Sequence, residues 1–170
     1  YDKAAKYFEA LAKNEDNASP YYAYYYLGRI RSEQEGAAFQ KAAEIAYKKS
    51  LDLKPDYVES LVALGSLYIK LDQEPKALEL YRTFQRDQGP NFRVAEILSQ
   101  AYLEQEKYDL ALEQLEILEA NSDDILNIKV KMALVYIEQK KFDPAIAKLK
   151  DILKQVPDSD KIRFYLAAVY

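Results

Sequence analysis

Pairs made of an apolar residue followed by a small one recur along the chain at a nearly constant spacing. They lie at Leu27-Gly28, Leu64-Gly65, Leu98-Ser99, Met132-Ala133 and Leu166-Ala167, and successive pairs are 37, 34, 34 and 34 residues apart. Three positions after the small residue come Arg31 and then four tyrosines, Tyr68, Tyr102, Tyr136 and Tyr170. Similarity of a sequence to itself at such a period indicates a repeat protein with units of about 34 residues.

A second series of small residues has the same period and predicts a second helix in each repeat. Ala43, Ala77, Ala111 and Ala145 are followed four residues later by Tyr47, Tyr81, Leu115 and Leu149, and seven residues later by Ser50, Phe84, Leu118 and Ile152. Spacings of four and seven residues place side chains on one face of an α-helix. Breakers at Pro55, Gly89-Pro90, 121–124 and Pro157 separate the repeats. Each repeat is therefore predicted to be two antiparallel helices, and the full repeats to span 21–57, 58–91, 92–125 and 126–159.

The residue types also indicate how these helices pack. A glycine, serine or alanine lets two helix axes approach closely, and neighbouring leucine and tyrosine side chains fill the remaining space. One pair of helices cannot bury its apolar face alone, so successive pairs must stack and share a continuous core. The predicted fold is therefore all-α, an α-solenoid that forms a single domain over residues 1–170.

The two ends of the chain are predicted to hold incomplete repeats. Residues 1–20 contain a stripe of Ala4, Phe8 and Leu11 and look like a second helix without its first. Residues 160–170 look like a first helix without its second, and Phe164 and Tyr170 would be left partly uncovered. Because solenoids normally present polar outer faces on their terminal helices, we expect the chain to be part of a longer repeat array.

The pattern resembles that of the tetratricopeptide repeat family. Three consecutive repeats carry the resemblance: Leu64-Gly65-x-x-Tyr68 with Ala77, Tyr81 and Phe84; Leu98-Ser99-x-x-Tyr102 with Tyr108, Ala111, Leu115 and Leu118; and Met132-Ala133-x-x-Tyr136 with Phe142, Ala145, Leu149 and Pro157. The first full repeat departs from the pattern, since Arg31 replaces the usual tyrosine and residues around 36–38 lengthen its internal turn. Glu74 replaces the aromatic residue that Tyr108 and Phe142 supply, so the turn before it is expected to be less well anchored. The resemblance implies a right-handed superhelix that binds protein or peptide ligands.

The resemblance also implies where a ligand would bind, because in this family the first helices line a concave groove. One stripe on each predicted first helix would face that groove. Its members, taken repeat by repeat, are Tyr22, Tyr25, Arg29 and Ser32; Glu59, Val62, Ser66 and Ile69; Arg93, Glu96, Gln100 and Leu103; and Asn127, Val130, Leu134 and Ile137. Family members that clamp the carboxylate terminus of chaperones place Lys and Asn on this stripe. Val62, Ser66 and Glu96 stand at such positions here, so chaperone-tail binding is not expected.

The run Tyr21-Tyr22-Ala23-Tyr24-Tyr25-Tyr26 allows two interpretations. In the structural interpretation, Tyr24 packs in the core and the other rings cover the preceding loop. In the functional interpretation, Tyr22, Tyr25 and Arg29 form a rigid patch of residue types that are enriched in binding hot spots. The sequence favours neither.

Composition argues against catalysis and against metal binding. The chain contains no cysteine and no histidine, so thiol nucleophiles, histidine-based triads and the usual zinc ligands are lacking. Asp123-Asp124 and Asp158/Asp160 could in principle act as an acid and a base. They lie in predicted inter-repeat turns, however, where short acidic side chains cap the next helix. We therefore expect a non-enzymatic protein that uses no cofactor and no metal.

Charge and hydropathy narrow the class of partner. The formal net charge of −4 disfavours nucleic acid, because nucleic-acid binders usually carry a basic face. No apolar run approaches the roughly 18 residues that a membrane-spanning helix needs, so no membrane insertion is expected. A cytoplasmic location is the working guess, and a periplasmic or membrane-tethered full-length protein is the alternative.

Two functions follow from these observations. The leading hypothesis is a scaffold that binds a peptide or a partner protein in the concave groove. The alternative is a structural role, in which the terminal helices mediate self-association and another part of the same protein fills the groove.

Overall fold

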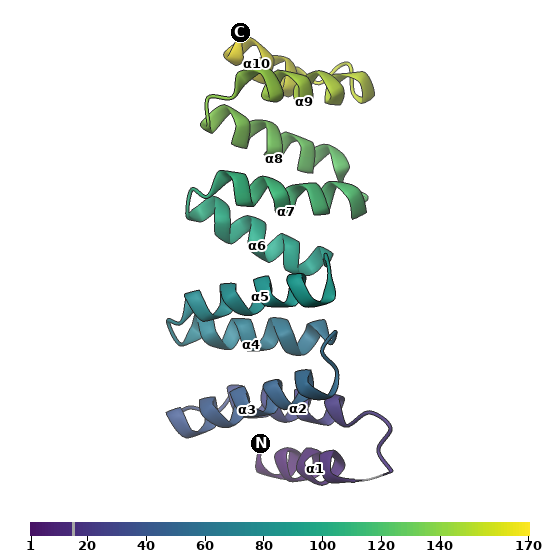
Figure 1. Cartoon of the computed structure of the whole chain (residues 1–170), viewed down its shortest axis with the longest axis vertical. Coiled ribbons are helices and arrows are strands. Elements are labelled where there is room, and N and C mark those ends of the chain that lie inside the picture. Colours follow the sequence, from purple (N-terminus) through teal and green to yellow (C-terminus); the bar gives the residue numbers. More distant parts are fainter. Residues whose placement is uncertain (15) are drawn as a thin grey trace. The chain divides into compact units, whose positions relative to one another are not determined.

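The computed structural model describes residues 1–14 and 16–170, and within them all the regular secondary structure is α-helical (Figure 1). The helices are α1 (Asp2–Lys13), α2 (Pro20–Ser32), α3 (Ala37–Leu53), α4 (Val58–Lys70), α5 (Glu74–Gln88), α6 (Phe92–Glu104), α7 (Tyr108–Asn121), α8 (Ile125–Glu138), α9 (Phe142–Gln155) and α10 (Asp160–Val169). No helix of the described ranges combines the length and the apolar character needed to cross a lipid bilayer.

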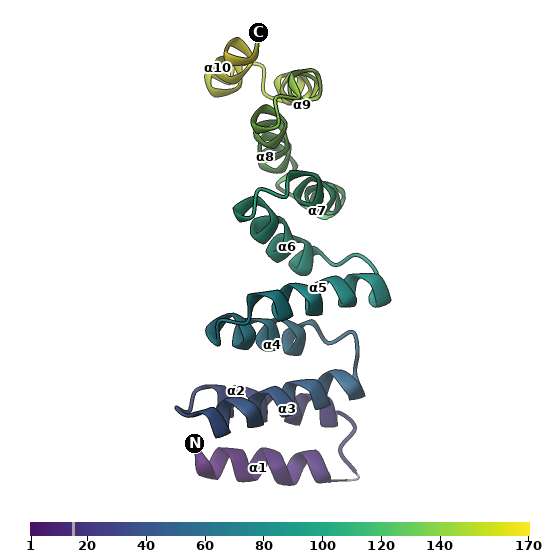
Figure 2. The same ribbon diagram turned by 60° about the vertical axis from the view of Figure 1, so that its left-hand side comes forward.

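The chain divides into two compact units. The N-terminal unit, Tyr1–Gly89, contains α1 to α5, and the C-terminal unit, Pro90–Tyr170, contains α6 to α10. In the N-terminal unit α2 pairs with α3 and α4 with α5 as antiparallel hairpins, while α1 packs on α2 (Figure 1). In the C-terminal unit α6 pairs with α7 and α8 with α9, and α10 follows on α9 (Figure 2). The predicted all-α fold of paired helices is confirmed.

The core of the C-terminal unit shows why one helix pair is not enough. Helix α8 contributes to two apolar clusters, because Met132 packs with Leu115 of α7 whereas Ala133 packs with Leu149 of α9. Neighbouring faces of one helix are thus buried against the previous repeat and against its own partner. Within this unit the core is continuous from repeat to repeat, as expected for a repeat array.

The stripe predicted for the first helix is displaced by one residue. Ala5, not Ala4, is the buried small residue of α1, with 1% of its surface exposed, and Ala4 is exposed. Ala5 precedes the start of α2 by the same fifteen residues that separate Ala43 from the start of α4. The prediction followed Phe8 and Leu11, which are only half-buried, instead of the period of the alanines.

In the N-terminal unit, Gly28 and Gly65 each lie directly under a tyrosine ring of the following helix. A methyl group added to Gly28 would lie 2.6 Å from ring carbon Cδ1 of Tyr47. A methyl group added to Gly65 would lie 2.0 Å from the hydroxyl oxygen of Tyr81. Both rings are buried, with 2% of Tyr47 and 1% of Tyr81 exposed. Glycine at these positions therefore allows close approach of the helix axes, as predicted.

The later repeats reach the same packing with a different division of volume. Ser99 and Ala133 stand where the earlier repeats have glycine, and Leu115 and Leu149 stand where they have tyrosine. Ala133 and Leu149 are both fully buried in one cluster. A larger residue on the first helix is thus matched by a smaller one on the second, which keeps the combined volume nearly constant.

The turns inside the second, third and fourth repeats have one common geometry. Asp72, Glu106 and Lys140, spaced 34 residues apart, have φ angles of 56°, 55° and 58°. The next amide donates to the carbonyl of Tyr68, Tyr102 or Tyr136 at 2.8 Å, the arrangement of a Schellman cap. The turn before Glu74 is closed by the same hydrogen bond as the other two, so the expectation that it is less well anchored is wrong for the backbone.

Acidic residues between the repeats do not cap the next helix by hydrogen bonding. Asp124 occupies the N-cap position of α8, but its carboxylate accepts hydrogen bonds from the Asn127 side chain at 2.8 and 2.9 Å, not from a backbone amide. Asp160 lies in the first turn of α10, after the N-cap residue Ser159. The capping role predicted for these carboxylates is therefore wrong, and only their favourable position at the helix N-terminus remains.

A group of four charges joins α7, α8 and α9 in the C-terminal unit. Lys129 has only 13% of its side chain exposed, and its amine contacts Asp151 and lies 3.8 Å from Glu119. Lys148 pairs with the same Glu119 at 2.7 Å. The hydrogen bond from Lys129 lowers the pKa of the Asp151 carboxyl group. We call Glu119, Lys129, Lys148 and Asp151 the charge network.

Because α4 and α5 approach closely, we expect replacement of Gly65 by alanine to lower the stability of the fold instead of raising it. Glycine to alanine inside a helix usually stabilises by about 0.5–1 kcal/mol. Gly65→Ala should instead destabilise, because the new methyl group would overlap Tyr81. The double variant Gly65→Ala/Tyr81→Leu, which copies Ala133 and Leu149, should recover most of the loss in urea-unfolding measurements.

Larger substitutions test the same contact and a second one. Gly65→Leu and Ala111→Leu should each lose about 1–3 kcal/mol of unfolding free energy, since both positions are fully packed. Ser66→Ala, one residue away on the exposed side of α4, is the control and should be neutral. Parent-like melting curves for both leucine variants would show that the repeat phase is wrong.

The charge network predicts a pH dependence. A carboxyl group whose pKa is lowered in the folded state stabilises the fold above its unfolded-state pKa, about 3.9 for aspartate, and this contribution is lost as the pH falls through the folded-state value. The melting temperature should therefore decrease when the pH is lowered beyond about 4. Lys129→Leu, which copies Leu61 of the N-terminal unit, should weaken the part of this fall that Asp151 causes. Parallel curves for the two proteins between pH 7 and 2 would contradict the assignment.

Candidate functional site

None of the predicted groove residues lies in the core. On α2 and α4, Tyr22, Arg29, Glu59, Ser66 and Ile69 are exposed, while Tyr25, Ser32 and Val62 are half-buried. On α6 and α8, Arg93, Glu96, Gln100, Asn127 and Leu134 are exposed, while Leu103, Val130 and Ile137 are half-buried. The predicted stripe therefore forms a surface on each first helix.

Two of the half-buried members also take part in packing. Leu103 lies against the cluster around Met132, and Val130 lies against the cluster around Leu149. Polar members of the stripe are held by neighbours on their own helix, because Gln100 donates to Glu104 at 2.7 Å. On α6 and α8 the stripe is thus a mixed surface of aliphatic and polar groups.

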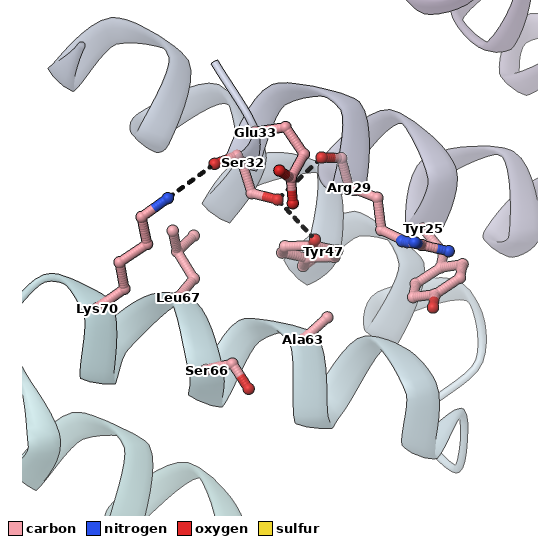
Figure 3. A pocket seen from close by; sticks show the side chains of 9 residues that line it. All are labelled: Tyr25, Arg29, Ser32, Glu33, Tyr47, Ala63, Ser66, Leu67 and Lys70. Carbon is pink, nitrogen blue, oxygen red and sulfur yellow. Dashed lines mark hydrogen bonds between the residues drawn. The ribbon is translucent and has the colours of Figure 1, made fainter. Parts of the chain in front are cut away.

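A pocket of about 250 Å³ opens between α2 and α4 in the N-terminal unit (Figure 3). It brings together four predicted residues, Tyr25, Arg29, Ser32 and Ser66, and does not include Tyr22, Val62 or Ile69. The residues that complete its lining were not predicted as site residues: Glu33, Tyr47, Ala63, Leu67 and Lys70. The α2–α4 pocket is the candidate functional site.

The wall of the pocket is set by the contact between Gly28 and Tyr47. Because the ring of Tyr47 lies across Gly28, its hydroxyl group reaches past α2 into the pocket. There it lies 3.3 Å from the hydroxyl of Ser32, which also donates to the Arg29 carbonyl at 2.9 Å. Burial raises the pKa of the Tyr47 hydroxyl, so this group stays protonated and can donate a hydrogen bond at neutral pH.

Two cations reach the pocket from opposite helices. The guanidinium of Arg29 lies 5.8 Å from the ring centres of both Tyr25 and Tyr26, a distance at which cations are attracted to aromatic faces. On α4, the amine of Lys70 donates to the Ser32 carbonyl at 3.3 Å (Figure 3). Among residues 1–14 and 16–170, neither cation has a carboxylate partner within ion-pair distance. Glu33 is the one acidic residue of the lining, so the pocket carries a net positive charge.

Some tyrosines of the run 21–26 are exposed at the surface, and others pack against neighbouring rings. Tyr22 is 45% exposed, and its hydroxyl lies 3.1 Å from that of Tyr26. Tyr25 makes an edge contact with Tyr57, with ring centres 5.6 Å apart, and also lines the pocket. Tyr24 is half-buried, and the fully buried residue of the run is Ala23. Tyr22 is thus available at the surface, whereas Tyr25 has a packing role as well.

The pocket residues missed by the sequence prediction all lie outside the predicted groove stripe. Tyr47 belongs to the packing stripe of a second helix, and Lys70 and Leu67 lie off the groove stripe of α4. A stripe drawn on one helix cannot show which side chains of a neighbouring helix reach the same space. Tyr47 lies four residues after Ala43, a spacing that predicts packing and does not show that the hydroxyl group reaches a pocket.

Comparison with known proteins places the chain among repeat proteins. Two family models described as tetratricopeptide repeat match residues 62–125 and 129–159, which together make up more than half of the chain. A protein CTR9 homolog of Arabidopsis thaliana is 36% identical over 88 residues, or 48% of this chain. Tetratricopeptide repeat protein 37 of Xenopus laevis is 30% identical over 118 residues, or 64% of this chain. The matched segment spans 7% of the length of each of these relatives.

A solved structure supports the fold. The structure of YrrB, a TPR protein with an unusual peptide-binding site, superposes with a TM-score of 0.63 over 98% of this chain and 83% of YrrB, at 17% identity. At that identity the likeness shows the fold alone. Together with the family matches and the paired helices, it leads to one assignment. The chain belongs to the tetratricopeptide repeat family.

Proposed function

We propose that this chain is a protein-interaction module, and that the exposed surface of α2 and α4, with the α2–α4 pocket at its centre, binds a segment of a partner protein. The observation that carries the proposal is the arrangement of Arg29. Its guanidinium is positioned by two tyrosine rings at the pocket and has no carboxylate partner among the described residues. Arginine and tyrosine are the residue types that dominate the binding energy of protein interfaces.

The geometry favours binding of an extended or helical segment over binding of a compact metabolite. The pocket is open and small, and the helices on either side of it carry further exposed groups, Tyr22 on α2 and Ile69 on α4. A ligand that enters the pocket with one side chain can therefore extend over both helices. Because the Arg29 side chain is already ordered by stacking, less side-chain entropy is lost when a partner binds.

The stripe residues of the C-terminal unit are proposed as a further part of the binding surface. Arg93, Glu96 and Gln100 of α6 are exposed polar groups, and Leu134 of α8 is an exposed apolar one. Such a mixture suits a polar segment with single apolar anchors. We infer binding and not catalysis, since the family is generally non-catalytic and the chain contains neither cysteine nor histidine.

Self-association is the second candidate, and it rests on α10. Phe164 is 70% exposed there, and Tyr170 is 79% exposed at the end of the helix. Exposed aromatic side chains of this kind are common anchors between protein molecules. In this case the partner is a second copy of the chain, which binds through α10.

The first proposal predicts that two exposed side chains matter for binding but not for folding. Tyr22→Ala/Arg29→Ala should leave the melting temperature nearly unchanged and reduce capture of native partners by more than tenfold, or about 2 kcal/mol. Capture from native lysate, quantified by mass spectrometry, is the measurement. Tyr25→Ala belongs in a separate variant, because loss of its contact with Tyr57 should lower stability.

A matched control separates the α2–α4 surface from general loss of tyrosine and arginine. Tyr7→Ala/Arg82→Ala removes the same two residue types from exposed positions on α1 and α5. This variant should capture the same proteins as the parent. If both double variants behave alike, the binding surface lies elsewhere.

The self-association candidate has its own test. Phe164→Ser should shift sedimentation from concentration-dependent dimer to monomer if α10 joins two copies. A parent that sediments as a monomer at all concentrations up to about 100 µM, a range that includes affinities typical of weak specific contacts, would eliminate this candidate.

A further inference from the structure

A second pocket of the N-terminal unit opens between helices α3 and α5, on residues that the α2–α4 pocket does not use. Its volume is about 340 Å³. Five of its nine lining residues are apolar: Leu51 from α3, Pro55 from the turn after α3, Leu61 from α4, and Leu80 and Phe84 from α5. Leu61 and Phe84 are buried, whereas Leu51 and Leu80 are half-buried and face the opening. We call it the α3–α5 pocket.

The C-terminal unit provides an internal comparison, because the same repeat positions occur there 68 residues later. Leu51 corresponds to Glu119, Leu61 to Lys129, Leu80 to Lys148 and Thr83 to Asp151. These four are the members of the charge network. Where the C-terminal unit has paired charges, the N-terminal unit thus has three leucines and a threonine, which line the α3–α5 pocket. The helices pair with either set of side chains at these positions.

The rim of the α3–α5 pocket is acidic. Asp52 and Asp87 are exposed on it, together with Gln88. Asp87 is paired with the adjacent Arg86 at 2.8 Å. Asp52 has no cation within ion-pair distance in the part of the chain that the structure describes. The corresponding residues of the C-terminal unit, Ala120 and Gln155, are uncharged.

We propose that the α3–α5 pocket is a second binding site, which takes one apolar side chain of a partner protein that has a lysine or arginine next to it. The pocket is large enough to admit a leucine or phenylalanine side chain, and its buried residues Leu61 and Phe84 offer apolar contacts to such a side chain. The adjacent cation of the partner pairs with Asp52. Electrostatic complementarity at the rim selects basic partners and rejects acidic ones.

This site is independent of the proposed function of the α2–α4 surface. The two pockets have no lining residue in common, and they open between different pairs of helices. A partner of the α3–α5 pocket could therefore bind at the same time as a ligand of α2 and α4. The chain would then connect two proteins.

The test uses short peptides and methyl NMR on the full chain. Acetyl-Lys-Leu-Lys-amide should shift the methyl signals of Leu61, at the floor of the pocket, in a saturable way. Acetyl-Glu-Leu-Glu-amide should bind at least about five-fold more weakly, because its charges face Asp52 and Asp87. Acetyl-Lys-Ala-Lys-amide should give no saturable shift, since it lacks the apolar side chain.

A variant that copies the C-terminal unit closes the pocket. Leu51→Glu/Leu80→Lys introduces the pair found at Glu119 and Lys148, and both substituted leucines are half-buried, so the core residues Leu61 and Phe84 stay in place. The Leu61 methyl shift caused by acetyl-Lys-Leu-Lys-amide should decrease at least tenfold in this variant. The Tyr22→Ala/Arg29→Ala variant should bind the same peptide as the parent does, which separates this proposal from the function proposed for α2 and α4.

A second variant tests the rim and does not depend on the folding of the first. Asp52→Ala/Asp87→Gln copies Ala120 and Gln155 at exposed positions, and should bring the affinities for the Lys- and Glu-flanked peptides within about two-fold of each other. The proposal is overturned if the parent shows no Leu61 shift with acetyl-Lys-Leu-Lys-amide, or if it binds the Glu-flanked peptide equally well. Leu61 shifts that appear without peptide as the protein concentration rises would also overturn it, because a second copy would then be the occupant.

Discussion

The contact between a small residue of each first helix and a large residue of the following helix sets the spacing on which the structure depends. In the N-terminal unit the ring of Tyr47 lies across Gly28, and the ring of Tyr81 lies across Gly65. This contact brings two backbones close together and also determines where the end of the large side chain emerges. The hydroxyl of Tyr47 reaches the α2–α4 pocket only because no side chain on Gly28 holds the ring away. Packing and the candidate binding surface therefore share one cause.

The positions that line the α3–α5 pocket and those of the charge network hold different side chains in the two units. Equivalent sites hold leucines in one unit and paired charges in the other, and the helices pair in both. Ion pairs are compatible with the half-buried positions among them, which correspond to Leu51, Leu80 and Thr83, because the desolvation of each charge is incomplete there. Freedom of this kind lets separate copies of one repeat acquire different surfaces. The α3–α5 pocket and the charge network are two outcomes on the same framework.

Much of this structure follows from periodicity in the sequence, and the rest depends on contacts between helices. The 34-residue spacing of Ala77, Ala111 and Ala145 was enough to predict the helix pairs, because each repeat imposes the same packing on the next. The same rule would have located Ala5, had the period been preferred to the bulk of Phe8. The exposure of Tyr22 and Arg29 was predictable from helical geometry. The part played by Lys70 was not, since it depends on how a side chain of α4 reaches Ser32 on α2.

The two ways of dividing volume between a helix pair also constrain how such a chain can evolve. The pair Gly65 and Tyr81 and the pair Ala133 and Leu149 are each compatible within themselves, but alanine in place of Gly65 beside the unchanged Tyr81 creates an overlap. A lineage that passes from the first solution to the second must shorten the tyrosine before it enlarges the glycine. Its intermediate then contains a cavity, which is tolerable only if neighbouring repeats supply enough stability. Recombination that exchanges whole helix pairs avoids this intermediate, because each small residue then stays with the large residue that it fits.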